Sequence, residues 1–128
     1  MSWDYWALMA VEALLIPAIM IILGRKFMNN PPEKMNYAFG YRSERSMRNK
    51  NTWDFAHRYI GRLWFCAGVA TAVATVAVVL VILGQSAESI SVVMGCVVII
   101  HLIPLLIPVF LTERALKKNF DENGNWRG

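Results

Sequence analysis

Residues 63–83, LWFCAGVATAVATVAVVLVIL, contain no charged side chain and decide the class of protein. An apolar stretch of about 18 residues or more is typical of a membrane-spanning helix, because about 20 residues at 1.5 Å each cross roughly 30 Å of hydrocarbon. The stretch also lacks the polar face that a helix at the surface of a soluble domain presents to water. It therefore predicts a transmembrane helix.

Two other stretches have the same character. Residues 5–23 are interrupted only by Glu12, and residues 90–111 contain His101 as their only ionisable side chain. The composition agrees, because 56% of the 128 residues are hydrophobic and 17% are charged, whereas soluble domains have about 45–50% and about 25%. Residues 5–23 lack the basic start and the cleavage site of a signal peptide. We predict an all-α integral membrane protein, a single membrane domain over residues 1–128 with three transmembrane helices.

The Lys and Arg residues predict how these helices are oriented. Residues 1–4 and the short connection 84–89 have none, whereas all 13 basic side chains lie in the loop 24–62 and the tail 112–128. Basic residues flank the cytoplasmic ends of transmembrane helices. We therefore expect the N-terminus outside, the loop and the C-terminal tail in the cytoplasm, and the net charge of +4 beside anionic lipid. No nucleic acid partner is expected, because no soluble domain carries this charge.

Glu12 and His101 lie deep in apolar stretches, where ionisable groups are costly and generally face the bundle interior, a partner or water. Counted from the outer ends of their helices, Glu12 lies about 10 Å deep and His101 about 16 Å deep. Neighbouring helices would let them pair directly or through one water. The pair is a candidate proton- or ligand-sensing site; the alternative is a polar contact that only fixes helix packing. Three prolines free backbone carbonyls in the same helices, namely Pro17, Pro104 and Pro108.

The stretch 63–83 also carries small residues at helical spacing. Gly, Ala and Thr about four residues apart let two helix backbones approach closely. We expect this face to pack against another helix of the chain or against a second copy in a homo-oligomer, because three thin helices bury little surface. The residues concerned are Ala67, Gly68, Thr71, Ala72 and Thr75.

The loop 24–62 is expected to form a folded cap on the membrane surface. Pro31 and Pro32 end the first helix. Asn51 is expected to cap a new helix that runs into the stretch 63–83, with Asp54 favourable to its dipole. A solvated basic loop needs few aromatic residues, whereas this loop contains Tyr37, Phe39, Tyr41, Trp53 and Phe55.

The tail 112–128 and the residue before it predict a short amphipathic segment. Its apolar side chains would face lipid while its Lys and Arg side chains face the headgroups. The apolar side chains are Leu111, Ala115, Leu116 and Phe120.

The polar segments carry a motif. It reads Pro31-Pro32-Glu-Lys-Met-Asn36, then Gly40-Tyr41-Arg42-Ser43-x-x-Ser46-Met47-Arg48-Asn49-x-x-Thr52-Trp53-x-x-Ala56-His57, then Gly61 and Trp64. The tail reads Thr112-Glu113-Arg-Ala-Leu116-Lys-Lys118-x-Phe120-Asp-x-x-Gly124. Over nearly the whole chain this pattern resembles the SdpI family of small bacterial membrane proteins. The resemblance marks signature residues with no established chemistry: Gly40, Tyr41, Arg42, Ser46, Asn49, Thr52, Trp53 and, in the tail, Glu113.

The resemblance implies a multi-pass protein of the bacterial cytoplasmic membrane. The best-known family member confers immunity to a secreted peptide toxin of its own cell, and it relays the toxin's presence by holding a small transcriptional repressor at the membrane. For this chain the resemblance implies a non-enzymatic immunity or signal-relay protein, with a peptide toxin and a soluble regulator as partners. A small oligomeric transporter or channel that uses Glu12 and His101 stays open as the alternative.

An enzyme is not expected from the motifs. The sequence has no Cys/His spacing typical of a metal site, no Gly-rich phosphate loop and no Ser/His/Asp set. We therefore predict no catalytic residue, no metal and no cofactor.

Overall fold

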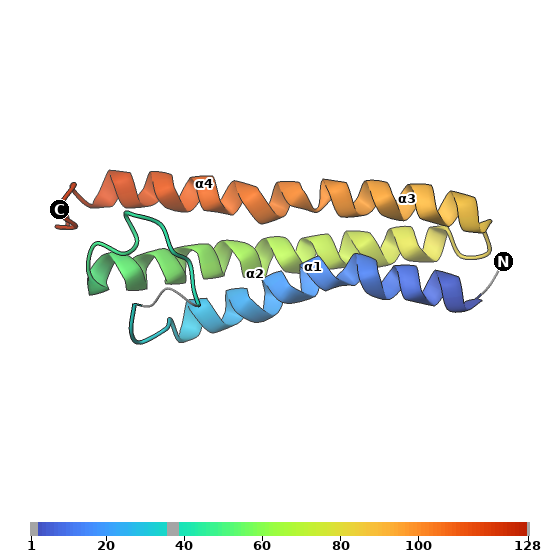
Figure 1. The fold of residues 1–128 in the computed structure, drawn as a ribbon, viewed down its shortest axis with the longest axis horizontal. Coiled ribbons are helices and arrows are strands. Elements are labelled where there is room, and N and C mark those ends of the chain that lie inside the picture. Colours follow the sequence, from blue (N-terminus) through green and yellow to red (C-terminus); the bar gives the residue numbers. More distant parts are fainter. Residues whose placement is uncertain (1–2, 36–38, 128) are drawn as a thin grey trace.

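A computed structural model describes residues 3–35 and 39–127 of the chain. It contains the helices α1 (Trp3–Asn29), α2 (Lys50–Val81), α3 (Ala87–Ile100) and α4 (Leu102–Asn119). Because α3 and α4 follow one another almost in line (Figure 1), the four helices form three long rods. Each rod is long and apolar enough to cross a membrane, and the described residues form no strand. The all-α fold with three membrane-spanning helices is confirmed.

The start of α2 is set by a reciprocal cap at Asn49, two residues before the position expected from the sequence. The Asn49 side chain accepts a hydrogen bond from the Thr52 amide at 2.9 Å, and the Asn49 amide donates to the Thr52 hydroxyl at 3.0 Å. This capping box satisfies two backbone N–H groups, so the expectation that Asn51 caps the helix is wrong. From this cap α2 runs without a break into the apolar stretch 63–83.

The third rod is interrupted at His101, which separates α3 from α4. Pro104 has no N–H to donate to the Ile100 carbonyl, so one hydrogen bond of the helix is missing at this point. The His101 amide still donates to the Val97 carbonyl at 2.9 Å, and the Leu105 amide donates to the His101 carbonyl at 3.3 Å. The interruption is therefore local, and the rod continues as one span.

Glycines bring α1 and α2 into close contact. A Cβ added to Gly24 would lie 2.8 Å from the Gly61 carbonyl oxygen, and one added to Gly61 would lie 2.7 Å from the Gly24 carbonyl oxygen. A Cβ on Gly68 would lie 2.9 Å from the Ile21 side chain. The expected packing role of the small residues in stretch 63–83 thus holds for Gly68. The tightest approach, however, is made by Gly24 with Gly61.

The opposite half of the bundle has an apolar core that joins all three rods. Its buried members are Ala13, Val79, Ile82, Ile90 and Met94. Trp6 and Tyr5 of α1 add polar contacts: the Trp6 indole donates to the Val79 carbonyl at 3.1 Å, and the Tyr5 and Ser91 hydroxyls bond each other. The outward faces remain strongly apolar, as Val81 and Phe110 are 78% and 73% exposed. Such a surface suits lipid rather than water.

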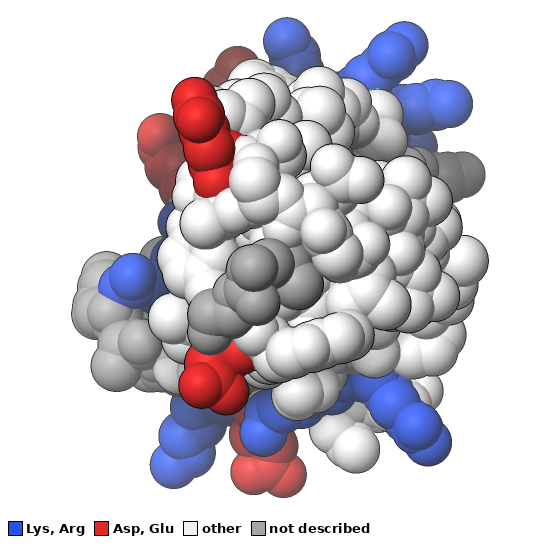
Figure 2. Space-filling model, turned by 90° about the vertical axis from the view of Figure 1, so that its right-hand side faces the viewer, with Lys and Arg blue, Asp and Glu red and all other residues white. Residues whose placement is uncertain are grey.

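The basic side chains gather at one end of the bundle. The α1–α2 loop, the start of α2 and the end of α4 lie together at that end, and the N-terminus and the α2–α3 turn lie at the other (Figure 1). Figure 2 looks onto the second end, where uncharged surface and acidic side chains dominate and basic side chains project only around the outline. The charge separation along the chain is therefore also a separation in space.

Candidate functional site: a hydrogen-bonded cap at the basic end

The motif residues build a folded structure at the basic end, which we call the cap. It comprises the described part of the α1–α2 loop, the first three turns of α2, and the end of α4 with the tail, that is residues 30–35, 39–60 and 112–127. Asn36 and Tyr37, which the sequence expectations also included, lie outside the described residues. The remaining expectation of a folded cap is met by the following contacts.

His57 fastens the loop to α2. Its Nε2 accepts the Tyr41 backbone N–H at 2.8 Å, and its Nδ1–H donates to the Trp53 carbonyl at 2.8 Å. A backbone amide can only donate and a carbonyl can only accept, so the two contacts require the neutral ring with its proton on Nδ1. Both ring nitrogens of this fully buried side chain are thereby satisfied.

The surroundings of His57 favour the same neutral form. His57 lies before the apolar stretch 63–83 of α2, and burial lowers the pKa of its imidazole, an effect opposed by the hydrogen bond to the Trp53 carbonyl and by Asp54. Its ring packs against Trp53, with 4.2 Å between centroids, and edge-on against Phe27 at 4.9 Å. His57 therefore has a structural role and holds the loop against α2. The sequence expectation did not include it among the site residues.

Gly40 is needed where the loop passes over the side chain of His57. Its φ is +114°, and a Cβ at this position would lie 2.7 Å from Nε2 of His57 and 3.2 Å from the Trp53 ring. Glycine adopts such a conformation without a steric penalty. The Trp53 indole then donates to the Pro32 carbonyl at 2.8 Å, so the loop is tied to α2 on both sides of Gly40.

Ser46 and Thr52 organise the second half of the loop. The Ser46 hydroxyl accepts the Ser43 amide at 2.8 Å and donates to the Tyr41 carbonyl at 3.1 Å. The Thr52 hydroxyl donates to the Ser46 carbonyl at 3.0 Å. Both side chains are fully buried, so these motif residues are used to hold backbone and are not displayed to a ligand.

Three of the four apolar side chains that were expected to face lipid are buried against protein, whereas Leu111 is 38% exposed. Ala115, Leu116 and Phe120 are buried, the last two against Ala56 and its neighbours in α2. The Asn49 side chain donates to the Gly124 carbonyl at 2.7 Å, where the chain turns with φ +83°. The expectation that these apolar side chains face lipid is wrong, because α4 passes directly beside the first turns of α2 and offers them a protein surface.

Glu113 and Tyr41 meet where the loop crosses α4. Burial and the nearby Glu113 carboxylate raise the pKa of the Tyr41 phenol well above its usual range. Beside them is a cavity of about 410 Å³, lined by Leu23, Phe27, Phe39, Gly40, Tyr41, Arg42 and Trp64. The structure thus brings most signature residues into one connected region, with Arg42 at its exposed edge.

Glu12 and His101, by contrast, are not brought together. Glu12 lies on the exposed face of α1. His101 is 3% exposed and faces α2, where its Nε2 lies 2.9 Å from the Thr75 hydroxyl. Within residues 3–35 and 39–127, no hydrogen bond or ion pair joins the two side chains. Over the same residues, no group of three or more His, Cys, Asp and Glu side chains is placed to hold a metal ion.

Comparison with known proteins adds the family. The SdpI/YfhL protein family matches residues 33–112, a range that contains the motif loop from Glu33 onward, all of α2 and α3, and most of α4. The uncharacterized protein YfhL of Bacillus subtilis (strain 168) is 37% identical over 54 residues, which are 42% of this chain and 49% of that protein. The match thus spans about half the length of this relative. No solved structure matches the chain. The chain belongs to the SdpI/YfhL protein family.

Proposed function

We propose that the chain is a non-enzymatic protein of the bacterial cytoplasmic membrane that acts in immunity to a peptide toxin and in relaying the toxin's presence. The carrying observation is the cap, in which the signature side chains of Ser46, Thr52 and Trp53 are buried and donate hydrogen bonds to the backbone of the loop. Such residues specify a shape, and a fixed shape at a membrane surface is suited to binding a partner. Family membership supports the same class of function.

The proposed orientation places the cap in the cytoplasm. It is supported by the gathering of Lys and Arg at this end, since basic residues are retained on the cytoplasmic side. In this orientation the exposed basic side chains of the cap meet anionic headgroups or a soluble regulator. The apolar outer faces of the three rods are then available to a membrane-active peptide that enters from outside.

The immunity role is tested by expressing the chain in a toxin-sensitive bacterium and challenging the cells with secreted membrane-active peptides. The intact chain is expected to increase survival. Thr52→Val, which removes a buried hydroxyl with little change in shape, is expected to reduce protection, whereas Asn51→Ala on the exposed side of the same turn is the matched control. Immunoblots of the membrane fraction separate lost function from lost protein. Absence of protection at a normal level of the intact chain contradicts the role.

The relay role is tested with the same cells. Reversal of the exposed pair Lys117 and Lys118 to Glu is expected to release a cytoplasmic regulator from the membrane fraction while toxin protection persists. Unchanged regulator distribution contradicts docking on this surface. Proton flux through the purified chain in proteoliposomes would instead favour the transporter or channel.

A further inference from the structure

The outward face of α1 carries a charged residue type in the middle of the membrane-spanning region. Glu12 is the only Asp, Glu, Lys or Arg in the three apolar stretches of the sequence, and it lies on the exposed face of the helix. By helical rise it is roughly 14 Å from Trp3 and roughly 18 Å from Gly24. Ionisable side chains at such a depth are costly in lipid and generally face a partner or water. Something must therefore cover Glu12.

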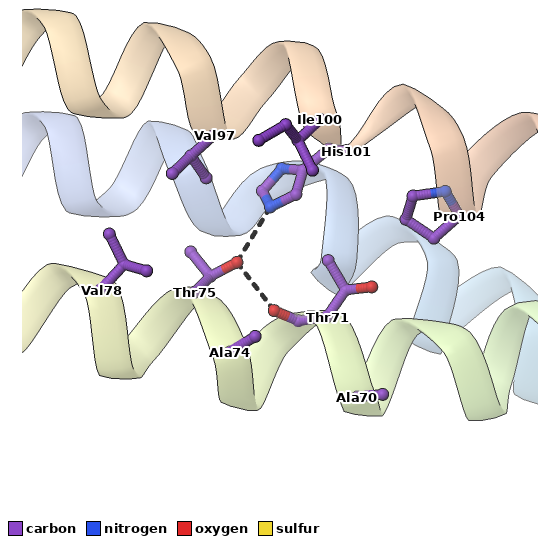
Figure 3. Close-up of a pocket in the computed structure, with 9 residues that line it drawn as sticks. All are labelled: Ala70, Thr71, Ala74, Thr75, Val78, Val97, Ile100, His101 and Pro104. Atoms are coloured by element: carbon purple, nitrogen blue, oxygen red, sulfur yellow. Dashed lines mark hydrogen bonds between the residues drawn. The ribbon is translucent and has the colours of Figure 1, made fainter.

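Glu12 differs in this respect from His101, the other ionisable side chain deep in the spans. His101 turns inward to α2, where its Nε2 lies 2.9 Å from the Thr75 hydroxyl (Figure 3). Glu12 forms no hydrogen bond or ion pair with any residue that the structure describes. Its side chain is too short to reach the headgroups, whereas the long Lys and Arg side chains that do so lie near helix ends. The partner of Glu12 must therefore come from a second molecule and lie at the same depth.

Glu12 belongs to a regular stripe along the outward face of α1. The stripe consists of side chains that follow one another at alternating intervals of four and three residues, and we call it the α1 seam: Leu8, Glu12, Leu15, Ile19 and Ile22. All five are exposed, and each of the four apolar members is at least 51% exposed. This spacing is typical of the line along which two helices pack as a coiled coil, and one polar residue on such a line fixes the register of the pair. The α1 seam is thus a helix-packing surface that no other described part of the chain covers.

A second copy of the chain meets the requirements of depth and chemistry. The distribution of Lys and Arg gives every copy the same orientation in the membrane, so the α1 helices of two copies run parallel. A two-fold axis along the membrane normal then places each residue of the α1 seam opposite its own counterpart at equal depth. A carboxyl group that keeps its proton is both a donor and an acceptor. Glu12 of one copy is therefore a suitable partner for Glu12 of the other.

We infer that the chain forms a parallel dimer in which two α1 seams pack against each other and the two Glu12 carboxyl groups are hydrogen-bonded across the interface. At least one of the two groups keeps its proton in this contact, because two carboxylates have no donor between them. The small-residue face of stretch 63–83 is not needed for self-association, since a Cβ on Gly68 would already lie 2.9 Å from the Ile21 side chain of the same chain. The dimer is independent of the proposed immunity and relay function.

Cross-linking of the full chain in bacterial membranes tests which face of α1 forms the contact. The two native thiols, which are unpaired and exposed, are first replaced by Cys66→Ala and Cys96→Ala. Single cysteines are then introduced by Ile19→Cys in the α1 seam and by Ala18→Cys beside it, both at exposed positions. Oxidation with copper phenanthroline is expected to link Ile19→Cys into a covalent dimer, because seam counterparts lie within the Cα separation of about 7 Å that a disulfide spans. Equal cross-linking at both positions, or none at Ile19→Cys, overturns the inference.

Variants of Glu12 test the hydrogen bond itself. Energy transfer between full chains that carry a donor or an acceptor dye at the C-terminus, measured in liposomes at increasing lipid-to-protein ratio, gives the dissociation constant of the dimer. Glu12→Leu is expected to raise this constant about 5- to 30-fold, whereas Glu12→Gln, whose amide also donates and accepts, stays close to the original chain. Unchanged SDS denaturation shows that each variant is folded. A Leu variant that dimerises as tightly as the original chain, or a Gln variant as weak as the Leu variant, contradicts the Glu12 contact.

Discussion

In the cap, the buried side chains of Ser46, Thr52 and His57 each have hydrogen-bond partners within the chain, whereas His101 in the spans has one partner and one bare nitrogen. Both regions are buried, so the difference does not lie in exposure. The cap is polar backbone held in place by many side-chain hydrogen bonds, although Oε2 of Glu113 is buried without a hydrogen-bond partner among the described residues. The spans are held by apolar packing and glycine contacts, and in their described part Nδ1 of His101 is a buried acceptor without a donor. The first arrangement fixes the backbone of a loop, whereas the second fixes how helices pack against one another.

The largest effect is expected where α1 and α2 touch, because this contact supports both regions. In Gly61→Ala, the new Cβ would lie 2.5 Å from the Met28 nitrogen and 2.7 Å from the Gly24 oxygen. Both atoms belong to the backbone, so the helices must separate, at a cost of about 3 kcal/mol in the free energy of unfolding. SDS titration of the protein in mixed micelles measures this.

Gly95→Ala is the matched control for that substitution. No atom lies within 4 Å of a Cβ added to Gly95, and alanine is favoured over glycine inside a helix by about 1 kcal/mol. The control should be as stable as the original chain or more stable. Equal destabilisation by both substitutions would refute the close glycine contact.

A smaller and local effect is expected from His57→Ala. The substitution leaves the Tyr41 amide without its acceptor and opens a space beside Trp53, and we expect a loss of about 2 kcal/mol. The change should be confined to the cap. Hydrogen exchange at the Tyr41 amide should therefore accelerate, while amides around Val79 keep their protection.

Lowering the pH tests the same difference between the cap and the spans without a mutation. Because burial lowers the pKa of His57 in the folded chain, the unfolded state binds this proton more readily. The stabilising contribution of His57 is thus fully present above the unfolded pKa of about 6.5 and is lost progressively as the pH falls below it. The protection factor of the Tyr41 amide, which is its exchange rate relative to the intrinsic rate at the same pH, should depend on pH in this way in the original chain and lose that dependence in His57→Ala.

The smallest effect is expected at the helix cap. Asn49→Ala removes the acceptor for the Thr52 amide and the bond to Gly124, and a lost N-cap costs about 1 kcal/mol. Asn51→Ala, at an exposed position in the first turn, should change the unfolding free energy by less than about 0.5 kcal/mol. The reverse order of the two effects would restore Asn51 as the cap.

The sequence was most informative about features that depend only on the order of residues along the chain. Uncharged runs long enough to cross a membrane predicted the three spans, and the distribution of Lys and Arg predicted a basic end. The cap residue was misplaced by two positions, because Asn49 and Asn51 are chemically alike; the reciprocal bonds to Thr52 and the tertiary bond to Gly124 distinguish Asn49. The tail was assigned to lipid because its apolar pattern suits any apolar surface.

By itself, the sequence determined that this protein is a bundle of three membrane-spanning helices with its basic residues in two segments. The tertiary structure decided which polar groups pair. Glu12 and His101 have depths that would allow contact, yet rotation of the helices turns Glu12 outward and directs His101 to Thr75. Hydropathy fixes how deep a residue lies along its helix axis, whereas its angular position relative to neighbouring helices follows from packing, here the fit of Gly24 against Gly61.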